Sequence, residues 1–109
     1  MANAYKILGQ AAPSATTATD VYTVPTSTEA IVSSITVCNR ASTSDTFRIA
    51  TLVGGGTVAN TDYIAYDAPI GPNDFLVITL GIGLATTDQV EVYAGTANLT
   101  FQVFGMEIT

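Results

Sequence analysis

The chain has 109 residues, the usual size of one domain, and a formal net charge of −6 from three Lys or Arg, nine Asp or Glu and no His. Charged residues make up 11% of it and hydrophobic residues 48%, so the sequence can build a core and is not expected to be disordered. Three cations cannot neutralise the roughly six or more phosphates that DNA binding uses, and an anionic membrane surface would repel the chain. We therefore expect neither nucleic acid nor a membrane as a partner.

The missing residue types narrow the chemistry further. Without His there is no Ser-His-Asp or Cys-His catalysis. The single Cys38 can form neither an internal disulfide nor a cysteine-rich zinc site. The longest apolar run, Phe75 to Ala85, falls short of the roughly 20 residues that span a bilayer, and the N-terminus is no secretory signal. We expect a soluble protein made inside a cell, with no catalytic residues, no cofactor and no metal.

In chain order, short runs rich in Val, Ile, Thr, Tyr and Phe alternate with clusters of Gly, Pro, Asn, Asp and Ser. This pattern predicts strands near Tyr5–Gln10, Val21–Val24, Ala30–Cys38, Thr46–Val53, Tyr63–Tyr66, Phe75–Leu80, Gln89–Tyr93 and Leu99–Glu107. No window has a sustained helical period. The expected fold is an antiparallel β-sandwich of about seven or eight strands, Ig-like or jelly-roll-like, with little or no helix.

Alternation within the strands predicts which side chains face the core. In the strand over 30–38 it groups Ile31, Ser33, Ile35 and Val37 on one face. In the last strand it groups Leu99, Phe101 and Val103. The run Phe75–Leu80 is apolar on both sides, so it is either central in the fold or covered by a second chain.

The first 20 residues differ in composition from the rest. Residues 11–20 are small and of low complexity, which suits an arm lying across another surface. We divide the chain into an N-terminal strand and extended arm, residues 1–20, and a sandwich domain, residues 21–109.

Most Asp residues fall at predicted strand boundaries, where a carboxylate caps a turn. A pair such as Asp62 and Asp67 could serve calcium or glycoside chemistry, but the spacing of a calcium loop is missing. Gly54–Gly56 lacks the Lys-Ser or Lys-Thr and the helix of a phosphate loop. Cys38 is expected to be a buried strand residue that acts as a small hydrophobe.

Five residues are candidates for contacts with other molecules. Arg40 and Arg48 either pair within the chain, with Asp45 or another turn carboxylate, or cross to a neighbouring subunit. Tyr63 and Tyr66 cannot both face one core in a regular strand, so one is expected at a surface. The candidate interface residues are Tyr5, Arg40, Arg48, Tyr63 and Tyr66.

The abundance of Thr, Ser, Ala and Gly with few charges suits a protein that covers, or is covered by, identical neighbours, since small side chains lose little entropy on burial. Several segments also resemble small virion proteins of tailed bacteriophages, notably of cyanophages and marine phages. These segments are residues 6–13, 21–25, 32–40, 46–50, 63–67, 80–88 and 92–94. The matching motifs are strand and turn signatures that cover nearly the whole chain.

The resemblance implies a β-sandwich structural component of the virion, some members of the group being capsid cement or decoration proteins. It implies a homo-oligomer, a trimer at local three-fold positions, that stabilises the shell by bridging major capsid subunits on the capsid surface after assembly in the host cytoplasm. The alternative is a receptor- or carbohydrate-binding module of a tail or fibre, with Tyr63, Tyr66 and Tyr93 stacking on sugar rings. A glycan-degrading enzyme that uses an Asp/Glu pair is a third possibility, and the short chain disfavours it.

Overall fold

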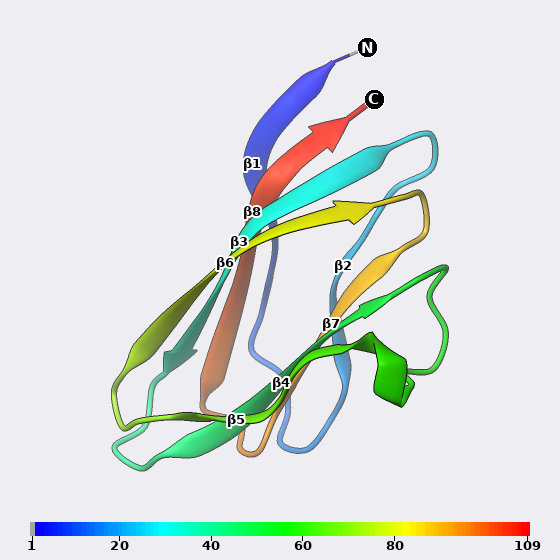
Figure 1. Ribbon diagram of the computed structural model, residues 1–109. Helices are drawn as coiled ribbons and strands as arrows, with labels where there is room; N and C mark the ends of the chain where they lie inside the picture. The colour runs from blue at the N-terminus through cyan, green and yellow to red at the C-terminus, as the bar shows by residue number, and fades with distance from the viewer. Residues whose placement is uncertain (1) are drawn as a thin grey trace.

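The computed structural model describes residues 2–109 (Figure 1). Its eight strands overlap the eight predicted ranges: β1 Asn3–Ala11, β2 Thr19–Thr23, β3 Glu29–Asn39, β4 Asp45–Leu52, β5 Tyr63–Ile70, β6 Phe75–Leu84, β7 Gln89–Ala94 and β8 Leu99–Ile108. The only helical element in the described chain is the 3₁₀ turn η1, Asn60–Asp62. Within residues 2–109, no helix has the length and apolarity to cross a membrane.

The strands form two four-stranded antiparallel sheets. Sheet A has the order β1-β8-β3-β6, and sheet B has the order β2-β7-β4-β5. Every connection except β4 to β5 crosses from one sheet to the other, as the ribbon in Figure 1 shows. This is the strand order of a jelly roll, in which two Greek keys fold over one another. The predicted β-sandwich is therefore confirmed, and its topology is jelly-roll-like, not Ig-like.

The core lies between the sheets and consists of the inward side chains of both. Leu99, Phe101 and Val103 of β8 are fully buried, as their alternation predicted. The rings of Phe101 and Phe47 meet edge to face across the two sheets, with centroids 6.3 Å apart. Burying each such side chain stabilises the fold by about 1.5–3 kcal/mol, so this layer is the main source of stability.

A β-bulge in β3 determines which side chains join that core. The pairing of β3 with both of its neighbours shifts between Val32 and Ser34. Relative to β8, Ser33 is an extra residue of β3, whereas in the pair with β6 the extra residue belongs to β6, because Leu80 and Gly81 lie opposite Ser33. Alternation therefore reverses at Ser33: Val32 points inward before it, and Ile35 points inward after it. The expectation that Ile31 shares the core face with Ile35 was wrong, because the bulge leaves Ile31 40% exposed on the opposite face.

β1 has a matching irregularity at the same level of the sheet. Its pairing with β8 shifts between Ile7 and Gly9, next to the β3 bulge. The backbones approach closely here, because a side chain on Gly105 of β8 would begin 2.0 Å from the carbonyl oxygen of Ile31. Only glycine fits at such a contact. The bulges and this glycine together bend sheet A.

The described part of residues 1–20 contributes β1 and the first two residues of β2 to the sandwich. β1 is the edge strand of sheet A along its pairing with β8, and β2 begins at Thr19. The two edges are joined by a polar contact: Tyr22 of β2 donates to Glu107 of β8 at 2.6 Å, and Lys6 of β1 lies 2.7 Å from the same carboxylate. Both partners hold the pKa of Glu107 below its usual range, Lys6 more strongly. Contact of residues 1–20 with a neighbouring molecule stays a prediction.

At the opposite side of the sandwich, β6 is the other edge strand of sheet A. The doubly apolar run Phe75–Leu80 is therefore not central in the fold. Leu76, Ile78 and Leu80 pack against the core, whereas Phe75 and Val77 point outward and are 67% and 57% exposed. The expectation of a central position is therefore wrong, and coverage of this run by a second chain stays a prediction.

The close approach at Gly105 generates a stability prediction. Gly105→Ala should lower the free energy of unfolding by about 1–3 kcal/mol or more, because the added methyl group overlaps backbone atoms that cannot rotate away. Gly71→Ala is the matched control, since its new methyl group would meet its first neighbour at 3.6 Å. Urea unfolding measures both variants, and equal midpoints would contradict the role given to this contact.

Candidate functional site

The outer face of sheet B carries a compact group of side chains around Arg48 of β4. The guanidinium carbon lies 4.2 Å from the ring centres of both Tyr66 of β5 and Tyr93 of β7. Asp67 accepts from Nε at 2.8 Å, and this hydrogen bond raises the pKa of Arg48 above its usual value. Tyr63 completes the group, since its ring meets that of Tyr66 edge to face at 4.8 Å. We call these five residues the Arg48 cluster.

Local backbone geometry brings the members of the cluster together. The pairing of β4 with β5 shifts on both sides of Ile49, and Asp67 adopts a positive φ of 50°. In a regular strand Tyr66 and Asp67 would point to opposite faces, but here both reach Arg48. The cation is thus stacked between two rings and paired with an anion within the chain.

The other candidate arginine behaves differently. Arg40 donates to the carbonyl oxygen of Ala97 at 2.8 Å, and no carboxylate lies within ion-pair distance of it in the described residues. Asp45 binds the hydroxyl and the backbone N–H of Thr96 instead. Pairing with a carboxylate within the chain is confirmed for Arg48. For Arg40, neither Asp45 nor another turn carboxylate of the described residues is a partner, because the turn before β8 binds both Arg40 and Asp45, and a contact of Arg40 with a neighbouring subunit stays a prediction.

Two carboxylates face one another beside the Arg48 cluster. Asp20 of β2 and Glu91 of β7 are cross-strand neighbours. Burial raises the pKa of Glu91 to about 7, and a hydrogen bond to Asp20 and the negative charges of Asp20 and Asp62 add to the shift. In a chain without His, this carboxyl group titrates near neutral pH.

The remaining carboxylates support turns. Asp62 accepts from the N–H of Ala59, and Asp74 accepts from that of Phe75, as the capping prediction requires. The Asp62–Asp67 pair considered for calcium or glycoside chemistry is not formed, because Asp67 binds Arg48 instead. Among residues 2–109, no group of three or more His, Cys, Asp or Glu side chains could hold a metal ion.

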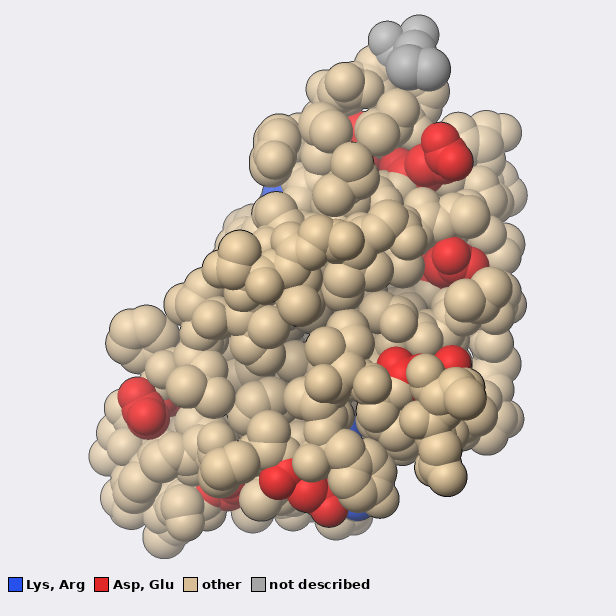
Figure 2. All heavy atoms as spheres, in the orientation of Figure 1, with Lys and Arg blue, Asp and Glu red and all other residues tan. Residues whose placement is uncertain are grey.

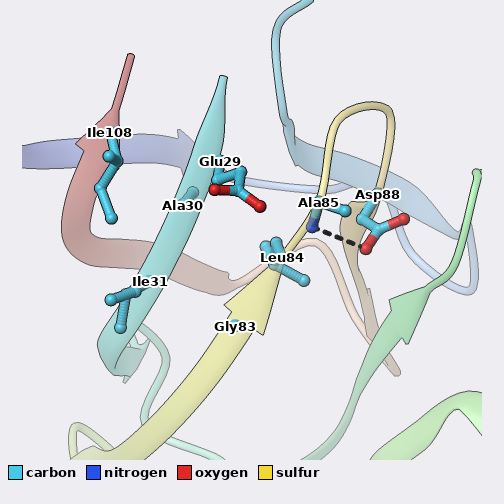
Figure 3. Close-up of a pocket in the computed structure, with 8 residues that line it drawn as sticks. All are labelled: Glu29, Ala30, Ile31, Gly83, Leu84, Ala85, Asp88 and Ile108. Atoms are coloured by element: carbon cyan, nitrogen blue, oxygen red, sulfur yellow. Dashed lines mark hydrogen bonds between the residues drawn. The ribbon is translucent and has the colours of Figure 1, made fainter. Parts of the chain in front are cut away.

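A hollow of about 400 Å³ opens at one end of the sandwich (Figure 3). It is lined by Glu29, Ala30, Ile31, Gly83, Leu84, Ala85, Asp88 and Ile108. Both carboxylate oxygens of Asp88 accept backbone hydrogen bonds, from Gly54 at 2.8 Å and from Ala85 at 2.9 Å. Asp88 therefore connects two turns, and the lining contains no Ser, Cys or Lys that could act as a nucleophile.

The outer face of sheet A has a different character. The even-numbered residues of β8 from Thr100 to Met106 point to this side, and their strand partners share it. We call this surface the uncharged face; it comprises Tyr5, Ile7, Gln10, Ile31, Ser34, Thr36, Cys38, Phe75, Val77, Thr79, Gly83, Thr100, Gln102, Phe104 and Met106. None of these residues is charged. In Figure 2, which views the molecule from the side where Figure 1 shows both sheets, acidic side chains are scattered over the surface and few basic atoms are visible.

Large apolar side chains are exposed across the uncharged face. Tyr5, which is 76% exposed, and Ile7 lie on edge strand β1, Phe75 and Val77 lie on the opposite edge strand β6, and Ile31 lies between them on β3. Cys38 is also exposed here, so its expected burial was wrong, because it lies between the inward-pointing Val37 and Asn39 and therefore faces outward. An exposed apolar surface on this scale is typical of a contact site for another macromolecule.

The five candidate interface residues do not form one site. Tyr5 lies on the uncharged face, Arg48, Tyr63 and Tyr66 lie in the Arg48 cluster on the opposite sheet, and Arg40 lies beyond the end of β3. Ile31, Phe75 and Val77 were not chosen as interface residues. The run that begins at Phe75 and is apolar on both faces could have indicated Phe75 and Val77. The exposure of Ile31 results from the β3 bulge, which the alternation of the sequence does not show.

The Asp20–Glu91 pair generates a prediction about pH. The pKa of Glu91 is raised on folding from about 4.5 to about 7, so its contribution to stability is complete below about 4.5 and is lost as the pH rises through 7. The wild-type protein should therefore unfold at lower urea concentration at pH 8 than at pH 5.5. Glu91→Gln should flatten this difference, whereas the control Glu29→Gln, which also removes one negative charge, should keep it. An unchanged slope in Glu91→Gln would contradict the assignment.

Comparison with known proteins does not identify a function for the chain. No protein family matches the chain, and no curated protein matches it either. The function must therefore be inferred from the surfaces themselves: a cation held between two aromatic rings on one sheet, and a broad uncharged surface on the other.

Proposed function

We propose that this chain is a capsid decoration protein of a tailed bacteriophage, which binds major capsid subunits through the uncharged face and associates with its own copies. The resemblance of its strand and turn segments to small virion proteins supports this role. The observation that carries the proposal is the uncharged face, where five large apolar side chains are exposed and their partners on the neighbouring strands carry no charge.

The dimensions of the uncharged face suit a stable contact. Four strands about 4.8 Å apart, with about ten residues each at about 3.3 Å per residue, offer roughly 600 Å². Covering this area on both partners buries about 1,200 Å², the lower limit of a stable specific interface. Binding at many equivalent positions on a shell would then multiply a modest individual affinity.

The low charge of this surface also suits a flat contact. Apolar, Thr and Ser side chains can be covered without leaving an ion buried and unpaired, which costs several kcal/mol per charge. The polar side chains among them can keep hydrogen bonds to a partner or to trapped water. Covering the whole length of such a surface therefore costs little desolvation free energy.

The Arg48 cluster argues against the carbohydrate-binding alternative. A sugar ring stacks on an open aromatic face, but one face each of Tyr66 and Tyr93 is already covered by the guanidinium group. The rings of Tyr63 and Tyr66 also meet edge to face, so each of these two rings is partly covered by the other. The cluster therefore uses within the chain the aromatic surface that this alternative needs.

Binding to capsid shells tests the proposal. Shells assembled from the major capsid protein of the same phage are sedimented with the purified chain, and Tyr5→Thr with Ile31→Thr should weaken binding about 10-fold or more, because both anchors are removed from an exposed surface. Val53→Thr is the matched control, since Val53 is 88% exposed but lies outside the uncharged face. Equal binding of the double variant, or a copy number of only a few per purified particle, would overturn the proposal.

A further inference from the structure

The four edge strands of the described sandwich differ in how they are protected from pairing with another chain. Natural edges carry charges, prolines or bulges, or are short, because an open row of N–H and C=O groups attracts further strands. β1 has Lys6 and a bulge, β2 has only five residues with Asp20 and a bulge, and β5 has Pro69 and Asp67. β6 also has a register shift, where Leu80 and Gly81 lie opposite Ser33 of β3, but it has ten residues, no charge and no proline.

Both faces of β6 are also apolar at this open edge. Inward, Leu76, Ile78, Leu80 and Ile82 contact the core but remain only partly buried. Outward, Phe75 and Val77 are largely exposed. The edge therefore offers unpaired backbone groups together with apolar surface above and below them.

We propose that β6 pairs with β6 of a second copy of this chain, antiparallel and about a two-fold axis, so that the two A sheets join into one continuous eight-stranded sheet. The inference deepens the self-association in the proposed function, and it rests on that function only for its biological setting. The contact itself is argued from the strand. A two-fold contact closes on itself, because each copy supplies the same edge.

The side chains of β6 fit this arrangement in one register. Residues on the same face must oppose one another, and pairing Thr79 with Thr79 of the second copy sets Val77 opposite Gly81 and Phe75 opposite Gly83. Nothing lies within 4 Å of where a side chain on Gly81 or Gly83 would begin. Val77 and Phe75 of each copy thus cover Gly81 and Gly83 of the other copy. Large side chains opposite glycines on a neighbouring strand are a combination that stabilises edge glycines.

The inward side chains match in the same register. Leu76 falls opposite Ile82 of the second copy, and Ile78 falls opposite Leu80. These are the side chains that the monomer leaves partly exposed at the open side of the sandwich. Pairing would therefore extend the cores of both copies toward one another.

The hollow at the end of the sandwich lies next to one of these contacts. Gly83 borders it together with Ile31 and Leu84, as Figure 3 shows. Phe75 of the second copy, opposite Gly83, would lie at this rim. An aromatic ring beside an apolar hollow buries much more area than it would on a flat strand.

Charge favours this edge over the others. Each copy carries a net charge of −6, so two copies repel one another wherever acidic groups approach. Contacts through β2 or β5 would bring Asp20 or Asp67 to the interface. The pairing of β6 with itself places no charged strand residue opposite another.

The oligomeric state in the absence of any capsid tests the inference. Sedimentation equilibrium of the purified full chain should show a dimer, and Thr79→Lys should raise its dissociation constant about 10-fold or more, because two lysines would face one another across the axis. Gln102→Lys is the matched control: it adds the same charge on the same face but on central strand β8, so the dimer should persist. A monomer at 100 µM, or a trimer or dimer that Thr79→Lys leaves unchanged, would overturn the inference.

Cross-linking tests the register and separates this inference from the proposed function. In a Cys38→Ser background, Thr79→Cys should form a disulfide-linked dimer under mild oxidation, because directly opposed residues bring their Cβ atoms within about 5.5 Å. Thr36→Cys in the same background faces outward from central strand β3 and should not. A missing Thr79→Cys dimer would overturn the register. Gln102→Lys should still weaken binding to shells if the capsid role is correct, so either proposal can fail alone.

Discussion

The bulge at Ser33 is the constraint on which the surface of sheet A depends. β8 runs through the sheet without interruption, whereas β3 and β1 each insert one residue at the same level. The insertion keeps Val32 and Ile35 in the core on either side of the bend, and it turns Ile31 outward. A β3 without the extra residue would have to expose part of the core side chains to keep its pairing. The apolar outer surface is thus a consequence of how the sheet bends.

Most ionised groups of the protein are engaged by local partners. Glu107 binds Lys6 and Tyr22, Asp67 binds Arg48, and Asp88 binds two backbone amides. These contacts join strands and turns, and exposed pairs of this kind add little to the free energy of folding. Their main effect is on surface composition, because these charges lie outside the uncharged face of sheet A.

The sequence allowed the strands to be predicted but not every face. All eight strands were found because Val, Ile and Thr alternate between turn residues, a signal that is local in the chain. The face of Ile31 was missed because a bulge depends on pairing with β8, which is distant in sequence. The Arg48 cluster was missed as a unit for the same reason, since Tyr93 comes from a strand 45 positions later than Arg48. The unusual character of Phe75 and Val77 could be recognised from the sequence, because their run does not alternate between apolar and polar residues.

The protected edge at β1 has a consequence for the size of an assembly. A sheet that grows by head-to-tail pairing of unlike edges continues into a fibre, whereas pairing of identical edges stops after two members. Joining at β6 would leave two copies of β1 as the outer margins, each interrupted by its irregularity at Leu8 and carrying the ammonium group of Lys6. The protein could thus carry an unprotected edge strand at high concentration without forming amyloid-like filaments.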